Sequence, residues 1–476
     1  MSRFDGRFAV VVATAATVVG APVMLRHEPW RDEVSVWLVA RTCKSLREEL
    51  TSIGYIGHPK VYHALVWLFA RLFSSPVPLA CVNLAAIIGA VLLFAGLAPF
   101  SRLHRALFAF GFFPLYQYGV IVRPYALIVL LLFVYAALRS QAPARLGTRF
   151  VVLAALAQLH VMASVAAAVL FVVDAATNDP RRWSRQAWLG TATLALSGLA
   201  SVWQLMPRTR QYRQWNLAPN MQKAFADGFM PIFAHRGLTS VEMSTGLILG
   251  AIGVVVALRH RGSRPWFVVL MASLVAFNYV VYVGFRWHHG FYFLYFVLAL
   301  WLGQVRLALL ESVYLAGLFA LHAVVGASAL YDDFRYPYST GAAVAAEIRA
   351  RGLEHLPIVG VLPEKRGVSF AFDEIQPVLV NLTDARAYDP QSRTYERYWR
   401  HYDDQNYFDV FPRTSLRAQL NRVHDEIGGP FVVVVILPKP NSPFGRLRPL
   451  DPLYVAPDSL DFGEHYALCV YPSPAS

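Results

Sequence analysis

Long runs of apolar residues, each nearly free of charge, fill the first 330 positions of this 476-residue chain. A helix of about 20 apolar residues is long enough to cross the hydrocarbon core of a membrane. Only 15% of the residues are charged, whereas a soluble domain carries about a quarter. Charged residues and prolines return at ordinary density after residue 330. We therefore expect a membrane domain over residues 1–330 and a soluble domain over residues 331–476.

The apolar runs predict an all-α polytopic membrane fold with about 11 transmembrane helices. The predicted spans are 8–26, 78–99, 106–121, 124–140, 149–160, 163–177, 187–206, 241–258, 265–284, 290–304 and 306–330. The two short segments between residues 149 and 177 are expected to form a hairpin. The first run is expected to remain as a signal anchor, because no small-residue cleavage site precedes His27.

The soluble tail is expected to be a small α/β domain. Helices are predicted over 342–353 and 416–427, and strands over 357–361, 378–380, 431–437 and 466–471. Such a domain would either bind an acceptor or serve as a structural cap. The loop 384–412, rich in Tyr, Asp and Arg, would suit contact with carbohydrate.

The segment 59–73 decides which side of the membrane every later linker faces. Only ten uncharged residues separate Lys60 from Arg71, which is too few to span a membrane. Its apolar residues recur every three or four positions and so share one face, as the spacing of Val61, Leu65, Leu68 and Leu72 shows. We expect this segment to be an interfacial helix that lies on the membrane.

The distribution of arginine supports that assignment. With the amino terminus inside, most arginines of the short linkers fall on the cytoplasmic side, as membrane topology favours. These are Arg102, Arg105, Arg139, Arg145, Arg149, Arg181, Arg182, Arg185, Arg259, Arg261, Arg264 and Arg306. If 59–73 crossed the membrane, the distribution would be inverted. We therefore expect a multi-pass protein of the cell or inner membrane, with the first outer loop 27–77 and the tail on the extracytoplasmic side.

The net charge of +13 follows from these linker arginines, and no basic stripe with interleaved aromatic residues indicates a nucleic-acid surface. No nucleic-acid partner is expected. The three cysteines, Cys43, Cys81 and Cys469, have neither metal-ligand spacing nor the pattern of a disulfide framework.

An acidic pair, Asp32 and Glu33, follows the first span and begins an amphipathic helical pattern. Carboxylates are favourable in the first turn of a helix, so the pair could simply stabilise that end. A carboxylate at the mouth of a membrane domain also suits a general base, because partial desolvation raises its pKa. The sequence leaves both roles open.

Cationic and hydrogen-bonding residues gather at the outer ends of other predicted spans. They are His58, Arg123, Tyr125, His160, Arg286, His288 and His289. Each has an ordinary alternative, such as a packed histidine or an arginine that reaches the interface. Arginine at a membrane edge usually has a partner or a task, and such groups beside aromatic rings could bind a phosphate. A metal site is possible but is not indicated by the spacing.

Four motifs resemble the GT-C superfamily of membrane glycosyltransferases, in the branch of the protein O-mannosyltransferases and the lipid A aminoarabinose transferase. They are EPWRDE, GHP, RPYAL and RWHHGFYF, and the resemblance covers about residues 1–330. It implies inverting transfer of a sugar from a polyprenyl-phosphate donor, with or without a divalent metal ion, to a lipid, glycan or protein acceptor. Asp32 would be the base, with Glu33 as its neighbour.

One departure from the family concerns the next outer loop, where relatives often carry a second acidic residue and this chain has Arg123. The departure favours Arg123 as a contact to phosphate or sugar. The alternative functions are a transporter of lipid-linked sugars and a non-catalytic subunit of an envelope polysaccharide complex. Transporters place ionisable groups near the middle of the bilayer, whereas here such groups lie at the outer ends of the spans.

Overall fold

The computed structural model of the chain is mostly helical. It describes residues 4–53, 58–142, 145–206, 221–232, 239–282, 284–362, 367–369, 416–436, 452–457, 459–460 and 466–472. The predicted strand 378–380 and the loop 384–412 lie outside these residues.

The chain divides into two compact units, each with its own interior. The first, called the helical unit, comprises Met1–Leu25, Ile56–Tyr62 and Val77–Tyr331. The second, called the sheet unit, comprises Arg26–Tyr55, His63–Pro76 and Asp332–Ser476. The first outer loop is therefore grouped largely with the tail, although about 250 residues of sequence separate them.

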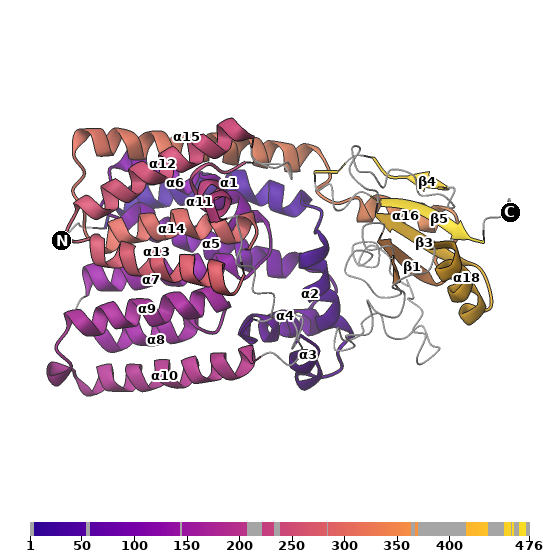
Figure 1. The fold of residues 1–476 in the computed structure, drawn as a ribbon, viewed down its shortest axis with the longest axis horizontal. Coiled ribbons are helices and arrows are strands. Elements are labelled where there is room, and N and C mark those ends of the chain that lie inside the picture. The colour runs from indigo at the N-terminus through magenta and orange to yellow at the C-terminus, as the bar shows by residue number, and fades with distance from the viewer. Residues whose placement is uncertain are drawn as a thin grey trace. The chain divides into compact units, whose positions relative to one another are not determined.

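Most helices of the helical unit run side by side along one direction (Figure 1). The elements are α1 (Gly6–Arg26), α5 (Val77–Leu97), α6 (Arg102–Ala109), η2 (Phe112–Val120), α7 (Tyr125–Gln141), α8 (Leu146–Leu156), α9 (Val161–Thr177), η3 (Pro180–Arg182), α10 (Arg185–Leu205), α11 (Met221–Phe229), α12 (Ser240–Arg259), α13 (Arg264–Val280), α14 (Arg286–Leu302) and α15 (Leu309–Arg335). The last residues of α1 and α15 belong to the sheet unit.

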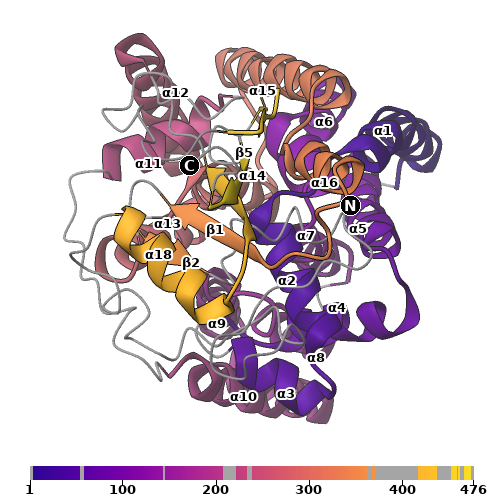
Figure 2. The same cartoon turned by 90° about the vertical axis from the view of Figure 1, so that its right-hand side faces the viewer.

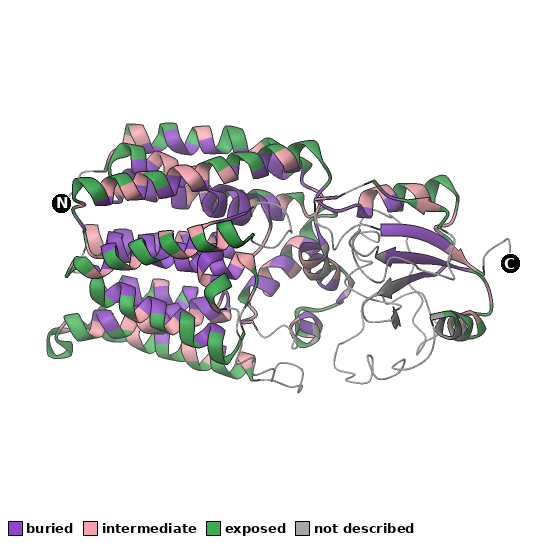
Figure 3. Ribbon diagram, turned by 45° about the horizontal axis from the view of Figure 1, so that its top comes forward, coloured by how far each residue is buried: buried purple, intermediate pink, exposed green. Residues whose placement is uncertain are grey.

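Four of these helices, α1, α5, α12 and α15, are long and apolar enough to cross a membrane. Their surroundings fit that role, because large apolar side chains remain exposed on the outside of the unit, among them Ile248 (61% exposed) and Val255 (66% exposed) on α12. Figure 3 shows this outer surface as exposed ribbon around a buried interior. The other predicted spans form helices that are shorter or less apolar, so the number of about 11 spans stays a prediction.

Helix α14 forms the centre of the helical unit. Every residue from His288 to Leu302 is buried. A helix that is apolar on all sides needs neighbours on all sides. The helix therefore holds the residues of its first turn, Arg286 to His289, against the surrounding helices.

The predicted span 106–121 is formed by two helical segments rather than by one continuous helix. Helix α6 ends at Ala109, and the π-helix η2 begins at Phe112. Two features explain the break. Pro114 has no N–H to continue an α-helical ladder, and the backbone at Phe110 passes so close to α15 that a Cβ on Gly326 would lie 2.7 Å from the Phe110 carbonyl oxygen.

The sheet unit contains a five-stranded sheet in the order β2-β1-β3-β5-β4. Its strands are β1 (Ile358–Leu362), β2 (Gly367–Ser369), β3 (Phe431–Ile436), β4 (Tyr454–Val455) and β5 (Tyr466–Tyr471). The β1–β3 pair is parallel and the other pairs are antiparallel. Helix α16 (Gly341–Ala350) lies on one face and α18 (Leu416–Ile427) on the other (Figure 2).

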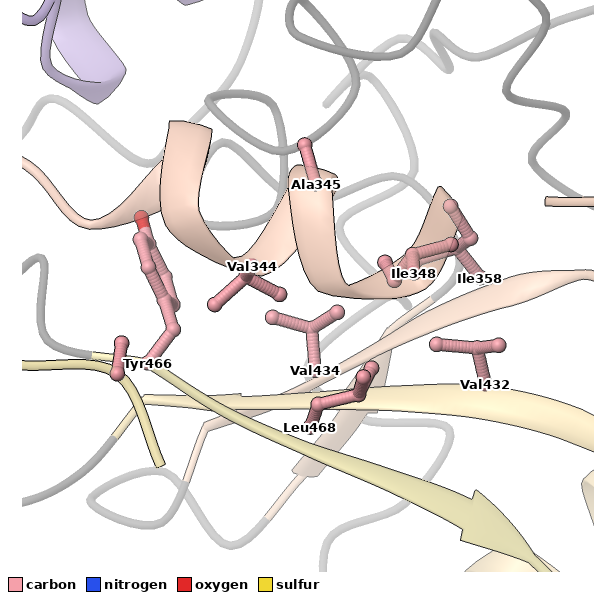
Figure 4. Close-up of a cluster of buried hydrophobic side chains, with 9 residues drawn as sticks. Val344, Ala345, Ile348, Ile358, Val432, Val434, Tyr466 and Leu468 are labelled. Carbon is pink, nitrogen blue, oxygen red and sulfur yellow. The ribbon is translucent and has the colours of Figure 1, made fainter. Parts of the chain in front are cut away.

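The face of the sheet under α16 carries the core of the sheet unit. Val344 and Ile348 of α16 point toward Val432 and Val434 of β3 and Leu468 of β5, and all five are fully buried (Figure 4). The predicted strands 357–361, 431–437 and 466–471 correspond to β1, β3 and β5. The description of the whole tail as an α/β domain stays a prediction, because 370–415 and 437–451 lie outside the described residues.

The first outer loop forms α2 (Arg31–Thr42), α3 (Leu46–Ser52) and α4 (Val61–Leu72). Leu38 of α2 packs against the core of the sheet. On α4, the apolar face predicted from the sequence is exposed at Leu68 (47%) and Leu72 (64%), whereas Tyr62 and Val66 on the other side are buried. An exposed apolar face is typical of a helix that lies on a membrane, which supports the prediction for 59–73.

Candidate functional site

A cluster of aromatic polar side chains lies within the helical unit. The ring of His160 is 4.0 Å from the ring of His58, 5.5 Å from that of Tyr125 and 5.6 Å from that of His288. His160, Tyr125 and His288 are buried, and His58 is half-buried. We call these four residues, together with Arg123, the histidine cluster.

The ends of separate helices position the cluster. His160 is the N-cap of α9, Tyr125 is the first residue of α7, and His288 lies in the first turn of α14. Arg123 lies in the short connection before α7. The Asn83 side-chain amide of α5 stabilises that connection, since it donates to the three carbonyl oxygens of Tyr118, Gly119 and Ile121 at the end of η2.

The backbone determines which ring nitrogen carries hydrogen in two of the histidines. The N–H of Met162 donates to Nδ1 of His160 over 3.2 Å, and the N–H of Phe285 donates to Nδ1 of His288 over 3.0 Å. A nitrogen that accepts a hydrogen bond carries no hydrogen, so each neutral ring carries it on Nε2. Nε2 of His288 bonds to the Tyr125 hydroxyl at 3.1 Å. Nε2 of His160 is buried and has no hydrogen-bond partner among the described residues.

Arg123 supplies the positive charge of the cluster. The side chain is half-buried, and it lies close enough to act electrostatically on both His160 and His288. The same two rings are acted on by His58. The cluster therefore combines a fixed cation with neutral N–H donors, an arrangement that attracts an anion.

The cluster is less suited to a metal ion. A neutral imidazole binds a metal through the nitrogen that carries no hydrogen. In His160 and His288 that nitrogen is Nδ1, which already accepts a backbone N–H. Over the described part of the chain, no three His, Cys, Asp or Glu side chains are grouped so as to hold a metal ion.

Two further predicted residues, Arg286 and His289, make contacts of their own beside the cluster. Arg286 donates to the carbonyl of Ile232. His289 bonds through Nδ1 to the carboxylate of Asp227 at 2.8 Å, and both residues are buried.

Asp227 was not found from the sequence. Its helix, α11, approaches α14 at Gly228, where a Cβ would lie 2.7 Å from the His289 carbonyl oxygen. The available signal was a single carboxylate in a short amphipathic helix of a membrane domain, where ionisable residues usually have a partner or a function.

The acidic pair Asp32 and Glu33 belongs to the sheet unit. Glu33 is buried, and its Oε2 accepts from the N–H of Trp30 over 3.2 Å at the start of α2. The same Oε2 lies 2.9 Å from Nε2 of His27. Glu33 therefore stabilises the end of the helix, which was one of its two predicted roles. Asp32, next to it in the first turn, is half-buried.

His27 lies between two carboxylates. Its Nδ1 is 2.8 Å from Oδ2 of Asp333 in the last turn of α15, and its Nε2 faces Glu33. Burial alone would lower the pKa of His27, but Asp333 and Glu33 outweigh it and hold that pKa well above its ordinary value. The ring is therefore an imidazolium at neutral pH and donates to both carboxylates.

A buried carboxyl in α3 is expected to make the stability of the protein depend on pH. Glu49 is fully buried, and burial raises its pKa to about 8. Between the ordinary pKa of a glutamate and about 8, the Glu49 carboxyl is therefore protonated in the folded chain and ionised in the unfolded chain. We expect this group to lower the free energy of unfolding by about 1.4 kcal/mol per pH unit as the pH rises over that interval. Glu49→Gln should remove this slope and raise the melting temperature relative to wild type at pH 8 more than at pH 5.5.

The measurement is thermal unfolding in lipid nanodiscs at the two pH values. Glu48→Gln, which changes the neighbouring and more exposed residue, serves as the control and should show a much smaller difference, because the Glu48 charge is the smallest contribution to the raised pKa of Glu49. Equal shifts for Glu49→Gln at both pH values would contradict the assignment.

The described features are those of a mostly helical protein with four helices long and apolar enough to cross a membrane, a largely buried histidine cluster in the helical unit and an acidic helix end in the sheet unit. No protein-family model matches the chain, and comparisons with curated proteins and with solved structures give no significant match.

Proposed function

We propose that the protein is an integral membrane glycosyltransferase. It would transfer a sugar from a polyprenyl-phosphate donor to an extracytoplasmic lipid, glycan or protein acceptor, with inversion. The observation that carries this proposal is the buried Nε2–H of His160, which lacks an acceptor among the described residues and lies in the same cluster as Arg123.

An unsatisfied buried donor costs about 1–3 kcal/mol, which an acceptor oxygen from a ligand would recover. The positive charge of Arg123 favours an anionic oxygen over a neutral one. A phosphodiester offers such oxygens, and its lipid chain would lie in the membrane. Tyr125, His58 and His288 are polar aromatic side chains of the same cluster, and we assign them to the adjoining sugar.

The proposed reaction needs one proton transfer and one displacement. Asp32 accepts the proton of the acceptor hydroxyl, and the acceptor oxygen attacks the anomeric carbon of the donor. The bond between that carbon and the phosphate oxygen breaks, and polyprenyl phosphate leaves with the bonding electrons. Arg123 and the Nε2–H of His160 stabilise the negative charge that develops on the departing phosphate.

The proposal includes a topology of about 11 spans, with the tail and the first outer loop on the extracytoplasmic side. The exposed apolar face of α4 and the distribution of linker arginines support it. The divalent ion that the family resemblance allows is not assigned a ligand set.

Photocrosslinking tests whether the histidine cluster binds the donor. A polyprenyl-phosphate analogue with a photoreactive group next to the phosphate is expected to label peptides that contain Arg123 or His160. Polyprenyl phosphate should compete for this labelling, whereas polyprenol, which lacks the phosphate, should not. Labelling confined to other helices, or equal competition by polyprenol, would contradict the proposed site.

A further inference from the structure

The amino end of α2, which carries Asp32, is held by a buried network of three charged residues. His27 contacts Glu33 at 2.9 Å and Asp333 at 2.8 Å, and the three side chains are between 0% and 5% exposed. Because both ring nitrogens face carboxylates, the cation is shared between α2 and the last turn of α15. Removal of one partner from such a network leaves an uncompensated charge in a buried position.

The network acts directly on the backbone at the start of α2. The Glu33 oxygen that bonds to His27 also accepts the N–H of Trp30, the N-cap residue of the helix. The position of Glu33 therefore depends on His27, and the orientation of the first turn depends on Glu33. Asp32 lies in that turn.

Other contacts hold the same segment to the rest of the sheet unit. The carboxylate of Glu28 accepts the N–H of Ala342 at the start of α16 over 3.0 Å. The ring of Tyr338 lies 5.0 Å from that of His27 and 6.3 Å from that of Trp30. The tail thus contributes side chains to the fixed geometry of α2.

We propose that His27 and Asp333 are positioning residues that fix the carboxylate of Asp32 in the orientation needed for proton transfer. The inference rests on the proposed function, in which Asp32 is the base. It assigns the beginning of the tail a role in the chemistry, since Asp333 acts on Asp32 through His27 and Glu33 without contact to the substrate. A displacement of about 1 Å at a catalytic group can cost on the order of 100-fold in rate.

The test uses the full chain in lipid nanodiscs, with the variants His27→Gln and Asp333→Asn. Asp333→Glu keeps the carboxylate and serves as the conservative variant. Glu311→Gln is the matched control, because Glu311 is a carboxylate in the first turn of the same helix, α15, and lies 2.9 Å from Nε2 of His260.

The first readout is hydrogen exchange of backbone amides and needs no activity. The Trp30 N–H and the first turn of α2 should exchange at least tenfold faster in His27→Gln and Asp333→Asn. The amides of β3 should be unchanged, which excludes general destabilisation of the sheet unit. Glu311→Gln should leave α2 unchanged, and unchanged exchange of α2 in both His27→Gln and Asp333→Asn would overturn the inference.

The second readout is the transfer reaction, measured as kcat and as the KM for donor. We expect His27→Gln and Asp333→Asn to lower kcat about 10- to 100-fold with the KM for donor unchanged, and Asp333→Glu to restore most of the loss. Faster exchange of α2 with an unchanged kcat would refute the positioning role. The remaining outcome is faster exchange of α2 in the variants together with a wild-type chain that transfers no sugar from any donor. In that case the network does stabilise the start of α2, and the proposed function is the part that fails.

Discussion

Asp32→Asn is expected to abolish most of the sugar transfer, with a loss in kcat of roughly 100- to 10,000-fold, the range found for removal of a general base. Asparagine has the size of aspartate but cannot accept the proton of the acceptor hydroxyl. The affinity for the polyprenyl-phosphate donor should be nearly unchanged, because the donor phosphate is assigned to the histidine cluster. Kinetics of polyprenyl phosphate release, measured beside donor binding, separate the two effects.

Glu48→Gln is the appropriate control for this substitution. It also removes one carboxylate from the first outer loop, on α3, without touching the start of α2. We expect it to retain wild-type transfer. Full activity in Asp32→Asn would rule out Asp32 as the base.

The second large effect is expected on donor binding. His160→Asn keeps an oxygen that can cap α9, since Asn is a favoured N-cap residue, but it removes the Nε2–H. A hydrogen bond to a charged group contributes about 1.5–3 kcal/mol, so the affinity for donor should fall about 10- to 150-fold. Arg123→Gln should weaken donor binding by a similar factor, because it removes the only guanidinium assigned to the phosphate.

The specificity of this effect can be tested in two ways. His260→Asn replaces another histidine of the helical unit, one that bonds to Glu311, and should leave donor affinity unchanged. Polyprenol without phosphate should bind wild type and His160→Asn equally. Undiminished affinity for the polyprenyl-phosphate donor in both His160→Asn and Arg123→Gln would exclude the cluster as the phosphate site.

The sequence predicts those parts of the fold that depend on local apolar content. The long apolar runs correspond to helices with boundaries within a few residues, and the spacing in 59–73 corresponds to the apolar face of α4. The break at Gly111 was missed: Pro114 is a local signal for it, but the close approach of α15 to Phe110, the other cause, leaves no local pattern.

The candidate site could be predicted only as a set of residue types. The polar residues at the outer ends of the predicted spans include the histidine cluster, but the tautomers of His160 and His288 depend on backbone contacts that only the structure gives. Asp333 is 306 positions from His27, so no spacing rule could pair them. Glu33 was predicted together with Asp32, and the structure distinguishes them, since Glu33 caps α2 and binds His27.

The most direct test of the proposed function is the release of free polyprenyl phosphate by the purified protein in lipid nanodiscs. The protein is given a panel of polyprenyl-phosphate sugars together with candidate lipid, glycan and protein acceptors. We predict release from one donor, dependent on an acceptor and lost in Asp32→Asn. A folded protein that binds these donors and releases no polyprenyl phosphate from any of them would contradict the proposal, and movement of the intact donor across the bilayer would identify a transporter instead.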